Sequence, residues 1–227
     1  MNDRFFKFPH TAHIAWFGEE LPRADKLAST EDVKHLFEDD VVIEEKIDGA
    51  NIGISIDETG IVRVQNRGAY LEEPFSGQFS RLTSWLAQHE QFLNQKLNQN
   101  IILFGEWCAA VHSIEYTRLP DLFLLFDVYD RDAEQFWSTD RRNAIVEGGE
   151  IHCVPRIQSG RTNLTELIDL LSDQTSRYGD QPAEGLVVRR DDEIWSTARG
   201  KLVRKEFVQT IDEHWKSKRI RWNRLEV

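Results

Sequence analysis

The chain has 227 residues, of which 40% are apolar and 30% are charged, and these proportions predict one sizeable globular domain with a hydrophobic core. They exclude a chain that is mostly disordered. The formal net charge of −11 also argues against a uniformly basic surface of the kind that holds nucleic acid.

The first 17 residues mix aromatic side chains with charged ones such as Arg4 and Lys7, so they lack the apolar core of a signal peptide. No segment approaches the roughly 20 consecutive apolar residues that a membrane helix needs. Cys108 and Cys153 have no cysteine or histidine at metal-ligand spacing, which is typical of reduced cysteines packed as small apolar side chains. We therefore expect a cytoplasmic protein with no membrane contact.

Lys7, His10 and His13 are spaced three residues apart before the first predicted strand. Two histidines with no carboxylate in the pattern do not provide enough ligands for a zinc site. We predict that both histidines are ordinary surface residues. A loop that folds over a bound nucleotide is the alternative.

Short runs rich in β-branched and aromatic residues dominate the chain and predict strands at 41–46, 51–57, 61–66, 100–107, 122–130, 184–190 and 201–206. Apolar residues at helical spacing predict helices within 79–97 and 163–175, and Ser138 can begin a third that runs to Ile145. A turn at 58–60 joins two of the strands as a hairpin, which implies antiparallel pairing. The expected fold class is therefore α+β, with an antiparallel sheet and flanking helices.

The most informative segment is the sequence EKIDGAN at 45–51. Lys46 ends a predicted strand and is followed at once by an Asp-Gly pair and a second strand, so we expect it on the rim of a sheet. A lysine held there can act as a nucleophile once its pKa, about 10.4 in a free side chain, is lowered by neighbouring cations, a metal or burial. The alternative is a plain Asp-Gly hairpin turn beside a solvated lysine.

Later segments complete a longer pattern in the same order. They are KxDGxN at 46–51, an arginine at 67 within QNRG, FGE at 104–106, FD at 126–127, EGxVxR at 184–189 and the basic strand KLVRK at 201–205. With these motifs the chain resembles the RNA ligase domain family, a branch of the covalent nucleotidyltransferases that include DNA ligases and mRNA capping enzymes. The resemblance spans about Val41 to Phe207. It implies an antiparallel, ATP-grasp-like ligase domain over residues 1–207, and we expect a basic helical extension at 208–227 packed on that domain.

The resemblance implies a three-step reaction driven by ATP and a divalent metal, Mg²⁺ or Mn²⁺. Lys46 would attack the α-phosphate to form a covalent lysyl-AMP, and pyrophosphate would leave. The AMP would then pass to the 5′-phosphate of an RNA end, and a 3′-hydroxyl would displace it to seal the strand. An in-line displacement at phosphorus needs an aligned nucleophile, cations over the phosphate oxygens and a metal, and the matched residues supply those roles.

The resemblance also assigns roles to individual residues. Residues matched to nucleotide contacts are Glu45, Arg67, Glu106, Phe126, Glu184 and Lys201. Residues matched to metal contacts, mainly through water, are Asp48, Glu106 and Glu184. Together with the basic tail, the match gives the residues expected to contact nucleic acid, which are Asn51, Arg67, Arg204, Lys205, Lys216 and Lys218. Phe126 corresponds to the residue that stacks on adenine, although a phenylalanine in an apolar run is also typical of a core.

The last basic strand departs from the family pattern. Lys201 corresponds to a lysine that contacts the α-phosphate, and we expect it to lower the pKa of Lys46 by like-charge proximity. The family usually has a second lysine two residues later, where this chain has Val203. Whether Arg204 or Lys205 supplies the missing charge stays open.

The basic residues are concentrated near the end of the chain. The stretch 199–224 holds nine basic and three acidic side chains, a net of +6, so the rest of the chain must carry −17 to reach the total of −11. This split predicts one edge that faces a polyanion on an acidic body. We expect weak, salt-sensitive capture of RNA that a partner protein or the metal assists.

Two other classes of function stay open on these residues. A DNA-nick ligase or a GTP-using capping guanylyltransferase would share the same lysine chemistry. A nucleotide- or RNA-binding module that keeps the fold but seals nothing is the second alternative, and Val203 favours it.

Overall fold

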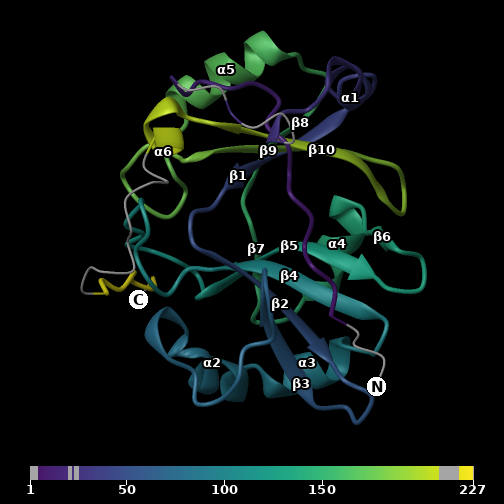
Figure 1. Ribbon diagram of the computed structural model, residues 1–227, viewed down its shortest axis with the longest axis vertical. Helices are drawn as coiled ribbons and strands as arrows, with labels where there is room; N and C mark the ends of the chain where they lie inside the picture. Colours follow the sequence, from purple (N-terminus) through teal and green to yellow (C-terminus); the bar gives the residue numbers. More distant parts are fainter. Residues whose placement is uncertain (1–4, 20–21, 23–25, 210–219, 227) are drawn as a thin grey trace.

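The computed structural model describes residues 5–19, 22, 26–209 and 220–226 of the chain. Two β-sheets lie one above the other, and helices cover their outer sides (Figure 1). Among the described residues, all strand pairs are antiparallel except one short parallel pair. The predicted α+β class with antiparallel pairing is therefore confirmed, although two sheets are present.

The first sheet has the strand order β10-β9-β1-β8. Its strands are β1 (Val41–Lys46), β8 (Arg156–Gly160), β9 (Gly185–Asp191) and β10 (Ser196–Val203). Helices α1 (Thr30–Leu36) and α5 (Leu164–Asp173) cover its outer face (Figure 1). Leu36, Leu167 and Leu171 are buried against the strands and hold these helices in place.

The second sheet has the order β3-β2-β4-β5-β6, with β7 paired parallel to β5. Its strands are β2 (Ala50–Ile56), β3 (Val62–Asn66), β4 (Ile101–Trp107), β5 (Phe123–Asp130), β6 (Gln135–Phe136) and β7 (His152–Cys153). Helices α2 (Leu82–Gln88) and α3 (Glu90–Lys96) bury Leu82, Trp85 and Leu93 in the core of this sheet. Helix α4 (Thr139–Val146) follows β6.

Local sequence signals explain most of these elements. Strands β2 and β3 form the predicted hairpin, and the side chains of Ser138 and Asn163 cap α4 and α5 by accepting backbone hydrogen bonds. The helical segment predicted at 79–97 is instead a 3₁₀ turn and two short helices, because the backbone leaves helical geometry at His89, where ψ is 9°. Strand β10 begins earlier than predicted, and helix α6 (Lys205–Gln209) follows it.

The tail beyond α6 is described at residues 220–226. These residues run in an extended path beside the segment 109–119, with bridges from Trp222 to Ala110 and from Leu225 to Leu119. The helix predicted for 208–227 falls largely on residues 210–219, outside the described residues.

Cys108 is fully buried, Cys153 is half-buried, and both thiols are free. The prediction of buried, reduced cysteines therefore holds fully for Cys108 and in part for Cys153. Across the described part of the chain, no helix has both the length and the apolar character needed to cross a bilayer.

Candidate active site

A cavity of about 880 Å³ lies where the two sheets meet, and both sheets and the N-terminal segment line it. Its volume is in the range of small-molecule sites. Seven of the predicted site residues line it, namely Glu45, Lys46, Asn51, Arg67, Glu106, Phe126 and Lys201. It also has lining residues to which no role was assigned from the sequence, including Phe8, Thr11, Glu44, Gln78, His112, Asp127 and Arg189.

The turn that follows Lys46 crosses from one sheet to the other. Strand β1 belongs to the first sheet and β2 to the second, so the two strands do not pair and a plain Asp-Gly hairpin is excluded. The backbone at Gly49 passes so close to β4 that a Cβ there would lie 2.7 Å from the carbonyl oxygen of Trp107, which explains the glycine. Lys46 is therefore fixed at the junction of the sheets.

Lys46 forms a close ion pair inside the cavity region. Its Nζ donates a hydrogen bond of 2.6 Å to Glu184 Oε2, and the two side chains are only 24% and 12% exposed. Burial alone would lower the pKa of Lys46, but the carboxylates of Glu184 and Glu106 outweigh burial and raise it. The net shift of the pKa of Lys46 is therefore upward, and attraction to these carboxylates outweighs any lowering by the like charge of Lys201.

The like-charge effect acts on Lys201 instead. Burial is the largest cause that lowers the pKa of Lys201 to about 8, and the positive charge of Lys46 lowers it further. Two backbone hydrogen bonds fix Lys201 to the N-terminal segment, one to the carbonyl of Ala12 at 2.9 Å and one from the N–H of Ile14 at 2.8 Å. Near neutral pH this side chain is a cation held beside the cavity.

Three carboxyl groups surround the one ammonium of Lys46. Glu106 pairs with Asn51 across β4 and β2, and burial raises the pKa of Glu106 to about 8, an effect that Lys46 opposes and that Glu184 and Asp48 reinforce. A divalent cation bound beside these carboxyl groups would favour their ionised forms. No three described His, Cys, Asp or Glu side chains lie close enough to hold a metal on their own. A cation here would therefore need water or ligand oxygens as well.

Asp48 does not line the cavity but points into the loop 108–119. Its Oδ2 accepts hydrogen bonds from the backbone N–H groups of Ser113 at 2.6 Å and Ile114 at 3.0 Å. Its own backbone N–H donates to the hydroxyl of Tyr116 at 2.8 Å. The aspartate of the KxDGxN motif therefore joins the Lys46 turn to this loop.

Phe126 reaches the cavity at a bulge in β5. In the register with β4, Leu125 pairs with Gly105 and Asp127 pairs with Phe104, so Phe126 is an extra residue in its strand. A bulge turns a side chain away from the regular alternation of a strand, which is how this ring comes to line the cavity.

The carbonyl oxygen that the bulge releases is held by two arginines. Arg142 Nη1 and Arg189 Nη2 donate to the Phe126 carbonyl at 2.7 Å and 2.9 Å. Phe8 packs edge-on against the Phe126 ring with a centroid distance of 5.3 Å. The ring is therefore fixed from its backbone and from its edge, and it stays half-buried at the cavity wall.

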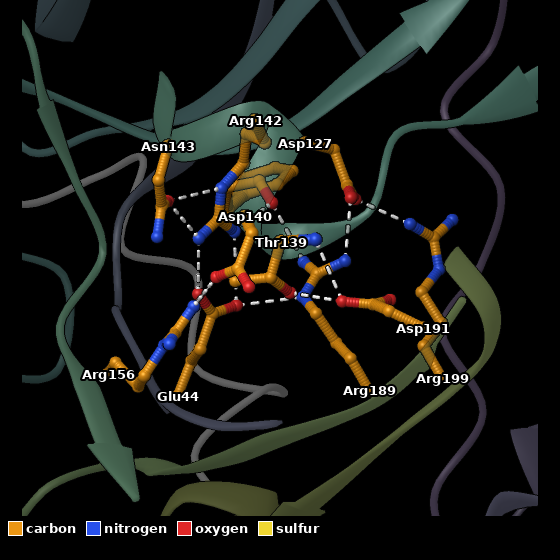
Figure 2. Close-up of polar contacts among 11 residues, drawn as sticks. Glu44, Asp127, Thr139, Asp140, Arg142, Asn143, Arg156, Arg189, Asp191 and Arg199 are labelled. Carbon is orange, nitrogen blue, oxygen red and sulfur yellow. Dashed lines mark hydrogen bonds and ion pairs between the residues drawn. The ribbon is translucent and has the colours of Figure 1, made fainter. Parts of the chain in front are cut away.

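These arginines belong to a buried ion network that joins the sheets (Figure 2). Glu44 of β1 pairs with Arg142 at 2.5 Å and with Arg189 at 2.7 Å. Asp127 of β5 pairs with Arg189 at 2.6 Å and with Arg199 of β10 at 2.5 Å. Both carboxylates are almost completely buried, so the network depends on its mutual pairing.

Glu45 lies on the opposite face of β1 from Lys46 and is also buried, yet it lines the cavity. Its Oε2 accepts a hydrogen bond of 2.9 Å from the backbone N–H of Arg177, and its Oε1 has no partner in the described structure. Burial raises the pKa of this carboxyl. A buried oxygen without a partner is free to bind a ligand.

The N-terminal segment 5–19 runs from the second sheet to the first (Figure 1). It contributes Phe8 and Thr11 to the wall of the cavity. His13 is 6% exposed, so the prediction of a surface histidine is wrong for His13, although His10 is exposed. Burial and the charge of Lys201 lower the pKa of His13 to about 3, so its ring is neutral. The segment acts as a fixed wall of the cavity.

Two residues predicted to contact nucleic acid, Arg204 and Lys205, do not line the cavity. The guanidinium of Arg204 donates to backbone carbonyls at and just beyond the end of α5. Lys205 pairs with Glu19 at 3.0 Å on the surface. Lys216 and Lys218 lie outside the described residues. The guanidinium of Arg204 therefore has a structural role.

The two remaining nucleic-acid predictions, Asn51 and Arg67, both line the cavity. Arg67 is exposed at the end of the β2–β3 hairpin. Val203 is buried, so the position of the family's second lysine carries no charge. Neither Arg204 nor Lys205 lines the cavity.

Some cavity residues could not be found from a motif. His112 and Gln78 meet through a 2.7 Å contact between Nε2 and Oε1; His112 lies in an irregular loop and Gln78 in a single 3₁₀ turn, Gly77–Phe79, and neither segment has a periodic pattern. Phe8 and Thr11 are also in coil. Asp127 and Arg189, in contrast, lie within the motifs FD at 126–127 and EGxVxR at 184–189, and this position in a motif could have identified them as site residues.

The comparisons with known proteins agree with this geometry. A family model described as RNA ligase matches residues 39–205. No curated protein sequence matches the chain.

Solved structures of an RNA ligase from Naegleria gruberi share the fold. A variant with ATP and Mn aligns with a TM-score of 0.64 and 19% identity over 94% of this chain and 60% of that chain. A variant with AMP and Mn aligns with a TM-score of 0.61 and 17% identity over 92% and 65%. The same ligase with PPi aligns with a TM-score of 0.60 and 19% identity over 92% and 65%. This chain thus spans less than two thirds of the length of the ligases that it matches.

Proposed function

The chain belongs to the RNA ligase family, and we propose that it is an ATP-dependent RNA ligase in which Lys46 forms a covalent bond to AMP. The observation that carries this proposal is the Lys46–Glu184 pair beside a nucleotide-sized cavity that Lys201 also lines. The Naegleria gruberi structures with ATP or AMP and Mn support the same ligands for this chain.

In the first step, Lys46 Nζ attacks the α-phosphorus of ATP in line with the bond to pyrophosphate. An N–P bond forms, the P–O bond breaks, and pyrophosphate leaves with the electron pair. Nζ must first lose a proton, and Glu184 Oε2 at 2.6 Å is placed to accept it. Burial raises the pKa of Glu184, which makes this carboxylate a better proton acceptor. Lys201 would stabilise negative charge on the α-phosphate oxygens.

The cavity offers a contact for each part of the nucleotide. Phe126 would stack on adenine, and the unpartnered Oε1 of Glu45 would accept a hydrogen bond from the adenine amine. Glu106 would bind the ribose hydroxyl groups. Arg67 and Lys201 would pair with phosphates.

A divalent metal, Mg²⁺ or Mn²⁺, fits the excess of carboxylates around Lys46. Glu106 and Glu184 would hold it mainly through water, with Asp48 adding negative charge, and when bound it would neutralise phosphate charge. With the carboxylates engaged in this way, the pKa of Lys46 would fall, because the negative charges that raise it would be compensated.

In the second and third steps, AMP passes from Lys46 to the 5′-phosphate of an RNA end, and a 3′-hydroxyl displaces AMP to seal the strand. Asn51 and Arg67 would receive the 5′-phosphate at the cavity. The basic stretch 199–224 would contact the RNA backbone, and a partner protein would help to organise the ends. We place this RNA repair reaction in the cytoplasm.

The decisive experiment incubates the full chain with α-labelled ATP and Mg²⁺ or Mn²⁺, followed by denaturation. Label should stay on the wild-type chain, and Lys46→Ala should reduce it to background. Lys34→Ala is the matched control, because Lys34 is an exposed lysine of α1. Absence of label under every metal would refute the enzyme and favour a binding module.

The alternative substrates are separated by the same assay. Label from GTP in place of ATP would indicate a capping-type guanylyltransferase. Sealing of nicked DNA but not of RNA would indicate a DNA ligase. Comparison of nicked duplex RNA, nicked DNA and single strands therefore defines the substrate.

A further inference from the structure

The described tail, residues 220–226, is built into the region of Lys46, although it lies beyond the family match at 39–205. Its backbone forms hydrogen bonds with loop 108–119 at Val111, Ala109, Tyr116 and Leu119, all between 2.8 and 3.0 Å. Trp222 packs on the core of the second sheet, and the guanidinium of Arg81 lies 4.3 Å from its ring centroid. Residues 220–226 are therefore held against this loop and the second sheet as a part of the folded domain.

The side chain of Asn223 makes three hydrogen bonds to the backbone of this loop. Its side chain is 3% exposed, its Oδ1 accepts from the backbone N–H of Tyr116 at 2.8 Å, and its Nδ2 donates to the carbonyls of Cys108 at 2.8 Å and Ala110 at 3.1 Å. One amide thus fixes both the start and the middle of the loop. Removing it would leave three buried backbone groups without partners, which is costly.

The other side of the same loop holds the Lys46 turn. Asp48 binds the N–H groups of Ser113 and Ile114, and the Tyr116 hydroxyl accepts the N–H of Asp48. Tyr116 is shared, since its backbone N–H meets Asn223 and its hydroxyl meets Asp48. Loop 108–119 therefore lies between the tail and the turn and is hydrogen-bonded to both.

We propose that Asn223 and Asp48 are positioning residues that clamp loop 108–119 across the turn after Lys46 and so align Nζ for attack on the α-phosphorus. This proposal rests on the proposed function. It assigns to Asp48 a hydrogen-bonding task through Oδ2, and it makes the tail a part of the adenylylation machinery rather than an RNA-binding appendage alone.

The test measures two quantities on the full-length chain, the single-turnover rate of Lys46–AMP formation at saturating ATP and the ATP concentration that gives half of that rate. Asn223→Ala should lower the rate about 10-fold or more, because small misplacements of a nucleophile are costly, and change the half-saturating ATP concentration less than about 2-fold. Glu226→Ala is the matched control, because its side chain is exposed on the same tail, and it should keep the wild-type rate.

Variants of Asp48 separate a clamp from a charge effect. Asp48→Ala should slow adenylylation as Asn223→Ala does. Asp48→Asn should be at least about 3-fold faster than Asp48→Ala, because an amide oxygen still accepts both N–H groups, whereas the charge of Asp48 is lost in both variants. The double variant Asp48→Ala with Asn223→Ala should be no slower than the slower single variant by more than about 2-fold, since both break one clamp.

Three results would overturn the proposal: a wild-type rate in Asn223→Ala, additive losses in the double variant, or Asp48→Asn as slow as Asp48→Ala. If Asn223→Ala does not fold, Tyr116→Phe replaces it, because it removes only the hydroxyl that receives the Asp48 N–H. Tyr116→Phe should slow the rate about 3- to 10-fold, and a wild-type rate there would equally refute the clamp. A wild-type chain that forms no adduct refutes the proposed function itself.

Discussion

Two groups of charged side chains lie beside each other on the same strands, and they are paired in opposite ways. In the buried ion network of Glu44, Asp127, Arg142, Arg189 and Arg199, every charge has an opposite partner within 2.7 Å. Around Lys46, three carboxyl groups share one ammonium, and Lys201 is a second cation with a lowered pKa. The first group is satisfied, and the second still has charge to offer a ligand.

The two groups are linked by strand geometry. Glu44 and Lys46 are two residues apart on β1, and Arg199 and Lys201 are two residues apart on β10. Residues at this spacing point to the same face of a sheet, so the network sets the position of the strands that present both lysines. The comparison indicates that satisfied buried pairs fix the framework and that unsatisfied ones mark the chemistry.

The largest expected effect is on stability, from the network. Glu44→Gln should lower the free energy of unfolding by about 3–5 kcal/mol, because it leaves Arg142 and Arg189 buried without their carboxylate. Urea denaturation measures this loss. The control is Asp140→Asn, whose carboxylate is exposed and pairs with Arg156, and its effect should be far smaller. Equal effects of the two variants would contradict the distinction between the two groups.

The second effect is on activity, from the Lys46 group. Glu106→Gln should slow Lys46–AMP formation about 100-fold, as loss of one electrostatic contact does in other active sites. Its stability should not fall: the folded pKa of about 8 lies above the unfolded value of 4.5, so ionisation of Glu106 costs stability as pH rises between them. Glutamine removes that cost. A clear drop in melting temperature at pH 8 would show that Glu106 belongs to the framework instead.

The third expected effect is a pH dependence of ATP affinity that comes from Lys201. Lys201 has a pKa of about 8, so it is charged below that pH and loses its charge above it. ATP affinity should therefore weaken above pH 8, by up to about 10-fold per unit until the pKa of the complex is reached. Lys201→Arg should keep its affinity to higher pH, because arginine stays protonated. Titration of ATP binding from pH 6.5 to 9.5 checks this, and identical profiles would exclude Lys201 as the titrating group.

Sequence predicted the parts of this comparison that depend on local pattern. The strand-end position of Lys46, the hairpin 51–66 and the strand positions of Glu106 and Lys201 follow from periodicity and motif order, and all of these lie where expected. The family resemblance further predicted which of these residues share one site. Strand pattern alone could not show that β1 and β2 lie in different sheets.

The rest depends on contacts that no short pattern records. Arg204 resembles a phosphate-binding residue in sequence, but its guanidinium donates to three backbone carbonyls at the C-terminal end of α5. Asn223 becomes important only because three backbone groups more than 100 residues away need partners. His13 is buried because its backbone lies between Lys201 of β10 and Leu27, with a bridge to each. Tertiary packing decides each of these outcomes.

The smallest expected effect is on RNA binding, from Arg67 at the exposed edge of the cavity. Arg67 is exposed and lines the cavity, so its contact with a phosphate is screened by solvent. Arg67→Ala should weaken binding of 5′-phosphorylated RNA about 3- to 10-fold and reduce the dependence of log affinity on log salt by about one. Arg63→Ala on the same hairpin is the control, because Arg63 lies over Tyr70 outside the cavity lining. Between 50 and 200 mM salt, affinity falls on the order of one decade per few phosphate contacts. Binding curves at these two concentrations therefore distinguish Arg67→Ala from Arg63→Ala. An unchanged salt slope in Arg67→Ala would show that Arg67 does not bind the 5′-phosphate, and Lys201 would then be the cation that receives it.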